Sequence, residues 1–236
     1  MSGGQYADAV PDTTVLDDPV RSSLTGVHAK FAQTQGRVMR YQPDVSIFSA
    51  FPLDPTGADW DDAVTLFGRG GQMSFSGTAP ELPSGWEIVM EIPGVQLTGH
   101  GVVGVADSEA LTLGAPDVPE MLDLVGRTKP GPFLQRTVEL GTYRGIRVDG
   151  RLAAMAGERT HPTGWTEISA VCTDPDYRGN GLASRLILDV AAGIVARGET
   201  PFLHTSADNA NAIRLYEQLG FVLRTELTFG AVRVPH

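Results

Sequence analysis

Residues 166–184 read TEISAVCTDPDYRGNGLAS, and two local patterns meet at a glycine-containing turn within them. Residues 166–173 are mostly β-branched or small, which is typical of a β-strand, and Asp-Pro-Asp then interrupts the pattern. From position 182 to position 194 the apolar residues recur with the spacing of an amphipathic helix. The stretch therefore predicts a strand that leads through a glycine loop directly into a helix.

Such a loop is suited to bind an anion. The first amides of a helix have no partner within the helix, and together with the helix dipole they attract phosphate groups. Gly179 and Gly181 allow the backbone to approach a ligand closely and to adopt positive φ angles. A turn at the start of a helix explains a lone Gly-x-Gly without any ligand. The loop is not a P-loop, because no Gly-Lys-Ser/Thr follows, and its context differs from that of a dinucleotide-binding fingerprint.

A longer string around the glycines and a second segment downstream are more specific. Residues 178–183, RGNGLA, match Gln/Arg-x-x-Gly-x-Gly/Ala, the acyl-CoA pyrophosphate loop of the GNAT acetyltransferases. Residues 208–221, DNANAIRLYEQLGF, match the second signature of that family, Asn-x-x-Ala-x-x-Leu-Tyr-x-x-x-Gly-Phe. Both stand in the order and at the separation usual for the family. The chain therefore resembles the GNAT superfamily over about residues 108–236.

The resemblance implies an α/β fold of the α+β kind. A mixed, mostly antiparallel sheet is flanked by helices, and its fourth and fifth strands splay apart so that the cofactor enters the gap. Residues 106–236 are expected to form this catalytic domain, and residues 1–105 a smaller N-terminal α/β domain that is a degenerate GNAT-like half without a cofactor. Within the second part the patterns predict a hairpin of residues 143–148 and 152–158, strands over 201–206 and 222–229, and helices over 118–125, 181–197 and 209–219.

The N-terminal part shows short elements of both kinds. Residues 1–18 are polar without periodicity and are expected to form a loose arm. Apolar spacing predicts helices over 19–32 and near 60–67, and strands over 38–41, 45–51, 73–75 and 86–92.

Composition limits the classes of function. The 236 residues carry a formal net charge of −10, and the single cysteine, Cys172, excludes an internal disulfide. The apolar runs are far shorter than the ~18 residues of a membrane span, and a secretory signal is not evident at the N-terminus, so a cytoplasmic location is expected. The acidic field should repel nucleic acid and anionic membranes and is compatible with a cationic acceptor, although solubility also explains it. The sequence leaves a homodimer open.

By resemblance, acetyl-CoA is the acyl donor and lies across the glycine loop and the end of the preceding strand. The residues expected to bind it are Val171, Cys172, Thr173, Arg178, Gly179, Asn180, Gly181, Leu182, Ala183, Ser184 and Asn209. The Val171 amide is the expected oxyanion donor, and Asn209 should also cap its helix. Cys172 is expected to be a packing thiol, because transfer in this family is usually direct. No metal site is expected.

Acetyl transfer to an amine needs a group that removes the ammonium proton. Strand alternation places Glu167 and Val171 on one face and Cys172 on the other, so Glu167 is the expected general base. A surface or ion-paired glutamate is the alternative interpretation. Glu158 and His161 are the next candidates, and Glu158 is also expected to contact the substrate.

Two further site residues follow from the resemblance. Tyr216 stands where GNAT enzymes hold a tyrosine near the CoA sulfur, so it is the expected general acid for the leaving thiolate. Phe133 lies in the loop that commonly borders the acceptor and is expected to bind substrate, although a core anchor for that loop fits equally well.

Two classes of function remain. The first is an N-acetyltransferase that moves an acetyl group from acetyl-CoA to a primary amine of a small molecule, amino acid or peptide by direct attack. The second is a non-catalytic acyl-CoA-binding sensor or partner subunit. The presence of both Glu167 and Tyr216 favours the enzyme, and no motif names the acceptor.

Overall fold

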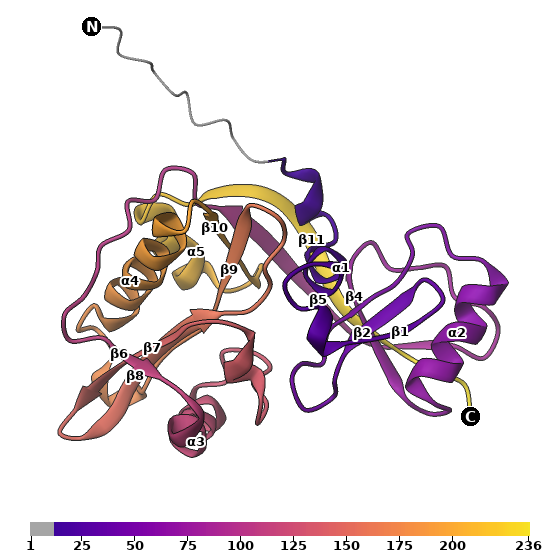
Figure 1. The fold of residues 1–236 in the computed structure, drawn as a ribbon, viewed down its shortest axis with the longest axis horizontal. Coiled ribbons are helices and arrows are strands. Elements are labelled where there is room, and N and C mark those ends of the chain that lie inside the picture. Colours follow the sequence, from indigo (N-terminus) through magenta and orange to yellow (C-terminus); the bar gives the residue numbers. More distant parts are fainter. Residues whose placement is uncertain (1–11) are drawn as a thin grey trace, which may run out of the picture.

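The computed structural model describes residues 12–236, so most of the predicted N-terminal arm lies outside the described residues. Eleven strands are described: β1 (Ala32–Gln35), β2 (Val38–Tyr41), β3 (Ser49–Ala50), β4 (Gln72–Gly77), β5 (Glu87–Thr98), β6 (Leu111–Leu113), β7 (Tyr143–Val148), β8 (Arg151–Glu158), β9 (Trp165–Thr173), β10 (Thr200–Ser206) and β11 (Val222–Arg233). The α-helices in this part of the chain are α1 (Pro19–Thr25), α2 (Gly57–Phe67), α3 (Val118–Thr128), α4 (Leu182–Ala196) and α5 (Ala210–Gln218). Figure 1 shows their arrangement.

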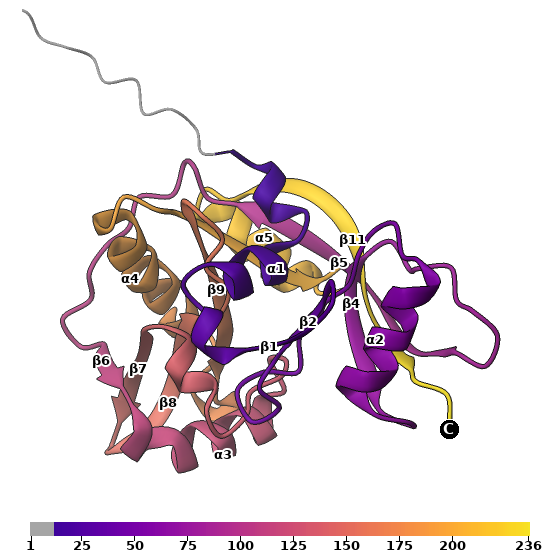
Figure 2. The same ribbon diagram turned by 45° about the vertical axis from the view of Figure 1, so that its right-hand side comes forward.

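Eight strands form one large sheet in the order β4-β11-β5-β10-β9-β8-β7-β6, and β1, β2 and β3 form a separate small sheet. All neighbouring strands of the large sheet pair antiparallel except β9 and β10, which are parallel. Helices α4 and α5 pack on one face of its central part, and α3 packs on the opposite face (Figures 1 and 2). The predicted mixed, mostly antiparallel sheet with flanking helices is confirmed.

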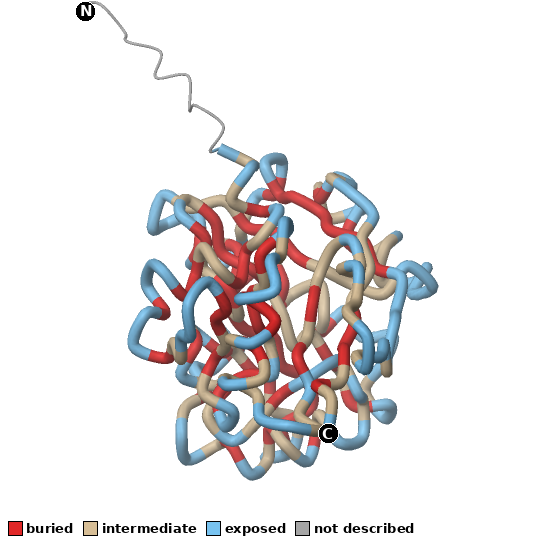
Figure 3. Tube along the Cα trace, turned by 90° about the vertical axis from the view of Figure 1, so that its right-hand side faces the viewer, coloured by how far each residue is buried: buried red, intermediate tan, exposed pale blue. Residues whose placement is uncertain are grey.

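The apolar core is divided between these two faces. Leu186 and Ile187 of α4 pack against Ile168 and Leu203 of the sheet, while Met121 of α3 packs on the other side. Figure 3 shows that buried residues follow the central strands, whereas the connecting loops are largely exposed. Within residues 12–236, no helix combines the length and the apolar character that crossing a lipid bilayer requires.

The central strands part where the resemblance implies. The parallel pairing of β9 and β10 runs from Trp165 and Thr200 to Ile168 and Leu203. Beyond that point β10 stays paired with β5, and β9 stays paired with β8. The two strands therefore splay over their C-terminal halves.

The large sheet also crosses the domain boundary expected near residue 105. Strand β5 lies between β10 and β11, and β4 pairs with the other edge of β11 (Figure 1). Both β5 and β11 are 12 residues long and extend from the central sheet toward α2 and the small sheet. Residue 105 therefore does not separate two sheets.

Strand β9 contains a bulge that the sequence did not reveal. Ala170 has a φ of 53°, and the register with β8 passes from Ser169 directly to Cys172. The extra residue inverts the alternation, so Ile168 and Val171 both pack on the α4 face while Cys172 packs on the α3 face. The prediction that Glu167 shares a face with Val171, opposite Cys172, is therefore wrong.

Other boundaries differ from the predicted ones for local reasons. The helix expected over 19–32 ends at Thr25, and a short 3₁₀ turn of Ala29–Phe31 follows after Gly26. The strand expected over 45–51 is reduced to Ser49–Ala50. Strand β5 continues six residues past the predicted end at position 92, to Thr98.

Candidate active site

The loop between β9 and α4 is open, and its two glycines adopt a conformation that other residues rarely adopt. Gly179 and Gly181 have φ angles of 82° and 73°, in the left-handed region. A Cβ atom added at either position would meet no neighbouring atom within 4 Å. The backbone of the loop is therefore accessible to a ligand.

The N-terminus of α4 keeps its first-turn amides available. Gly181 is the N-cap residue, and no side chain caps the helix, since the Asn180 amide instead donates to the Tyr177 carbonyl at 3.1 Å. Arg178 is exposed beside the loop, and Ser184 lies in the first turn. A 15-residue helix with uncapped amides and a nearby guanidinium suits a diphosphate.

From Ser169 to Thr173, the edge of β9 that faces β10 has no paired strand, because the pairing of the two strands ends at Ile168. An exposed strand edge can pair with the amide groups of an extended ligand. The Thr173 hydroxyl is buried and has no hydrogen-bond partner among the described residues. The splayed edge and the α4 N-terminus, joined by the glycine loop, fit the expected binding mode of an acyl-CoA.

Helix α5 places Tyr216 on the face of the sheet that α4 also covers. The Asn209 side chain accepts a hydrogen bond from the Ala212 amide at 3.2 Å, so the predicted helix cap is confirmed. Tyr216 is buried against Phe221, with ring centroids 6.1 Å apart, in the cluster that includes Leu182 of α4. Burial raises the pKa of Tyr216 to about 12, so the phenol keeps its proton at neutral pH.

Glu167 lies on the other face of the sheet at the centre of a buried polar cluster. Its side chain is 1% exposed and accepts two hydrogen bonds from the Arg159 guanidinium, one of them from Nε at 2.9 Å. Thr160 Oγ1 donates to it at 2.7 Å, and His204 Nδ1 lies 2.6 Å from Oε1. Four donors therefore surround the two carboxylate oxygens, which together offer about four lone-pair sites.

This surrounding determines the basicity of Glu167. Burial favours the protonated form, but the charge of Arg159 and the hydrogen bond with His204 outweigh it and hold the pKa of the carboxyl well below its usual range. A carboxylate with a depressed pKa and occupied lone pairs is a poor proton acceptor. The arrangement corresponds to the ion-paired alternative, and catalysis by Glu167 stays an untested prediction.

The cluster continues as a row of polar side chains across four neighbouring strands. The Gln96 amide nitrogen donates to the Leu16 carbonyl and lies 2.9 Å from His204 Nε2, while Gln96 Oε1 accepts from Arg224 at 2.9 Å. Since Nε2 accepts here, His204 carries its proton on Nδ1 and donates to Glu167. Sequence reasoning missed this row, because each member comes from a different strand and no local motif marks it.

The other predicted site residues lie apart from this row. Glu158 is buried, accepting from the Thr142 amide at 3.0 Å and from Arg197 at 2.8 Å. His161 Nε2 lies 3.7 Å from Glu158, and burial lowers its pKa. Phe133 packs in the core against Tyr143, with ring centroids 5.5 Å apart.

Cys172 is buried in the α3 face of the core. Burial raises the pKa of its thiol to about 11, so the nucleophilic thiolate is scarce at neutral pH. The prediction of a packing thiol is confirmed.

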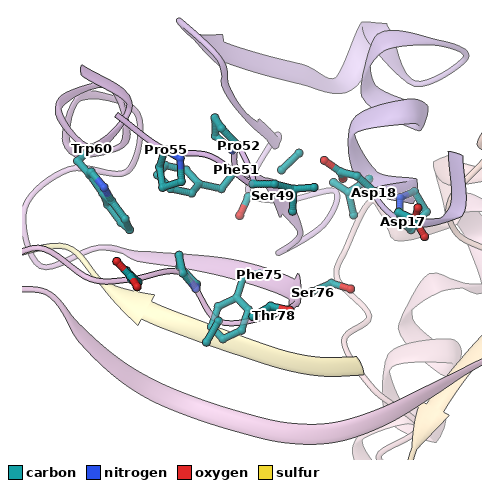
Figure 4. A pocket seen from close by; sticks show the side chains of 17 residues that line it. Asp17, Asp18, Ser49, Phe51, Pro52, Pro55, Trp60, Phe75, Ser76 and Thr78 are labelled. Atoms are coloured by element: carbon teal, nitrogen blue, oxygen red, sulfur yellow. The ribbon is translucent and has the colours of Figure 1, made fainter. Parts of the chain in front are cut away.

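Glu167 lines a small cavity that adjoins a larger one. The larger, of about 470 Å³, is bounded by α1, β3, α2 and β4 and is distant along the chain from the glycine loop (Figure 4). The smaller, of about 20 Å³, is lined by Glu167, Arg159, Thr160, His204, Phe229 and Phe48 together with residues of α1 and β4. Pro19, Val20 and Ser76 line both cavities, which therefore adjoin each other.

Comparison with known proteins identifies the family. The family model described as FR47-like protein matches residues 140–229. The N-alpha-acetyltransferase RimI of Mycobacterium tuberculosis is 31% identical over 131 residues, which cover 49% of this chain and 81% of that protein. A mycothiol acetyltransferase of Nocardiopsis dassonvillei is 31% identical over 163 residues, which cover 61% of this chain and 48% of that protein.

A solved structure extends the likeness to nearly the whole chain. The crystal structure of a putative GNAT-family acetyltransferase from Novosphingobium aromaticivorans is 41% identical, with a TM-score of 0.84. The match covers 94% of this chain and 98% of that one, so it includes the N-terminal half. The chain therefore belongs to the GNAT family of acetyltransferases and is an acyltransferase.

Proposed function

We propose that this enzyme transfers an acetyl group from acetyl-CoA to a primary amine. The observation that carries the proposal is the uncapped N-terminus of α4, which follows an open glycine loop and adjoins the unpaired edge of β9. These features supply donors for a diphosphate and backbone partners for an extended amide-containing arm. Residues 178–184 and Asn209 are the proposed binding groups for the donor.

The chain's own residues then have distinct tasks. Acetyl-CoA, when bound, supplies an activated thioester carbonyl. The amide of Val171, next to the bulge at Ala170, is proposed to donate to the oxygen of that carbonyl as negative charge develops. Tyr216, protonated at neutral pH, is proposed to give its proton to the departing thiolate.

The surroundings of Glu167 bear on which group removes the proton of the acceptor ammonium. The carboxylate oxygens of Glu167 already accept hydrogen bonds from Arg159, Thr160 and His204. We therefore assign Glu167 to holding these three side chains in position rather than to removing a proton from the acceptor. The amine is then expected to react from its neutral form, after its ammonium proton has left to solvent. The second proton, which the nitrogen loses as the amide forms, also leaves to solvent, and Tyr216 regains its proton from solvent. A primary amine acceptor agrees with the name of the Mycobacterium tuberculosis relative, an N-alpha-acetyltransferase.

The test is release of the CoA thiol from acetyl-CoA in the presence of a panel of amines. The panel holds small alkyl and aryl amines, amino acids and short peptides with free N-termini. Thiol release that depends on an amine supports the proposal. Acetyl-CoA binding by calorimetry without turnover on any amine would favour the acyl-CoA-binding sensor or partner subunit instead.

A further inference from the structure

The larger cavity has the size and lining of a small-molecule site. Its volume of about 470 Å³ falls within the ~300–1,000 Å³ typical of ligand pockets. Phe51, Trp60 and Phe75 form an aromatic wall, with the rings of Phe51 and Trp60 4.5 Å apart (Figure 4). Ser49, Ser76 and Thr78 add hydroxyl groups. This combination suits a ligand with an apolar or aromatic body and a small polar part.

The charge of the lining has one sign. Asp17, Asp18 and Glu81 line the cavity, and none of its lining residues is Lys, Arg or His. Asp17 pairs with Arg224 and Asp18 with Arg21, both outside the lining, whereas Glu81 makes no ion pair within residues 12–236. A wall that combines carboxylates with aromatic faces favours a cation, through charge and through cation–π contact.

The cavity also adjoins residues close to the splay of β9 and β10. Through Pro19, Val20 and Ser76 it adjoins the smaller cavity, whose far wall contains Glu167 and His204. Glu167 lies one residue before Ile168, the last residue of β9 that pairs with β10. The two adjoining cavities together therefore extend from the aromatic wall to Glu167, beside the point where β9 and β10 begin to part and on the face opposite α4.

We propose that the larger cavity is the acceptor site and that it takes a small primary amine with an arylalkyl body. The inference rests on the proposed acetyltransferase function and names the substrate class of that same site. The aromatic wall holds the body of the acceptor, and the Glu81 carboxylate, which makes no ion pair within residues 12–236, attracts its ammonium form. Ser76, which lines both cavities, marks the side of the site from which the amine faces β9. The test must distinguish this acceptor from the alternative, a peptide that is bound through the backbone at its N-terminus.

The steric test places a bulky side chain where the two cavities adjoin. Ser76 lies in β4, is half-buried and lines both cavities, so Ser76→Phe should obstruct that part of the site without touching the α4 loop. With 2-phenylethylamine and tryptamine as acceptors, KM should rise roughly tenfold or more, in line with the ~10–200-fold discrimination that pocket volume provides. The Kd for acetyl-CoA by calorimetry should not change. Ser108→Phe, the same substitution at an exposed position outside both cavities, is the control and should match the parent.

The electrostatic test reverses one charge. Glu81→Lys should raise KM for 2-phenylethylamine several-fold, and the difference should shrink at high salt because the site is exposed. Asp61→Lys makes the same charge change on the exposed side of α2, outside the lining, and should leave KM unaltered.

The outcomes separate the inference from the function on which it rests. If amines are acetylated but Ser76→Phe keeps the parental KM, or if only peptide N-termini are acetylated, the inference is overturned and the acetyltransferase function stands. If acetyl-CoA binds but no amine is acetylated, the proposed function fails. Titration of tryptophan fluorescence with 2-phenylethylamine then tests whether the larger cavity binds an arylalkyl amine. Binding that Ser76→Phe abolishes supports the assignment of the cavity, and absence of binding overturns it.

Discussion

At the scale of single residues, Tyr216 has the clearest test. Tyr216→Phe keeps the ring that packs against Phe221 and deletes only the hydroxyl. Because burial keeps the phenol protonated at neutral pH, loss of that proton donor should lower kcat by ~10²–10⁴-fold. The Kd for acetyl-CoA by calorimetry should stay near the parental value. A change confined to KM would assign Tyr216 to binding instead.

A substitution of Glu167 should change the stability of the fold as well as the rate of the reaction. Glu167→Gln removes the negative partner of buried Arg159, and breaking such a pair costs about 3–5 kcal/mol. The parent carboxyl has a folded-state pKa below its usual 4.5, so its contribution is present above about pH 4.5 and is lost as pH falls toward the folded-state pKa. Urea unfolding from pH 7 downward should show a lower free energy of unfolding for the variant, with a difference that narrows in acid.

A matched control and a contrary result define that experiment. Glu109→Gln removes an exposed partner of Arg185, and its cost should lie near the ~0–1 kcal/mol of surface ion pairs. A Glu167→Gln protein that is as stable as the parent, slow at neutral pH and faster at high pH would instead restore Glu167 as the general base.

At the scale of elements, the start of α4 is the part of the site that matters most for the donor. Gly181→Glu adds a side chain and a negative charge where the first-turn amides should meet the diphosphate, at a φ of 73°. Acetyl-CoA affinity should fall steeply while the far-ultraviolet circular dichroism remains that of the parent.

Gly198, just beyond the other end of α4, provides the control. Its φ is 77°, and a Cβ there also meets no atom within 4 Å, so Gly198→Glu imposes the same strain and charge away from the loop. It should retain acetyl-CoA affinity by calorimetry. Equal losses in both variants would attribute the effect to strain and remove the loop from the site.

The elements also show which features a sequence can predict. Helix α4 and the hairpin around Asp149-Gly150 follow from local spacing and turn chemistry. The end of β5 could not be predicted in this way, because Pro93 and Gly94 are residues that usually interrupt a strand. In the structure Gly94 is required within the sheet, since a Cβ there would lie 2.3 Å from the Phe229 ring. The bulge at Ala170 leaves no mark in the side-chain pattern, so alternation failed there.

The candidate site divides in the same way. The glycine loop and the α5 signature are contiguous in sequence and could be recognised there. The row formed by Arg224, Gln96, His204 and Glu167 could not, because its members are brought together only by the order of four strands. Likewise, the aromatic wall of the larger cavity combines residues from β4, α2 and the loop after β3.

At the scale of the whole molecule, the large sheet links the two halves of the sequence. Strand β5 is the neighbour of both β10 and β11, and Val95 and Leu97 on it belong to the core beneath α4 and α5. The Leu16 carbonyl also accepts from Gln96 in the polar row. The N-terminal half therefore supplies two strands of the sheet that carries the glycine loop, and the two halves of the sequence are expected to unfold together.

A pair of fragments tests this dependence. A fragment of residues 106–236 lacks β4 and β5, so β10 would lose one of its two paired edges and β11 would lose both of its neighbours. The core would also lose Val95 and Leu97. It should show no cooperative urea transition and no binding of acetyl-CoA, whereas the full chain should unfold in one transition by fluorescence and circular dichroism. A fragment of residues 72–236 retains all eight strands and should recover much of the transition. Cooperative folding and acetyl-CoA binding by the 106–236 fragment alone would show that residue 105 does separate independent domains.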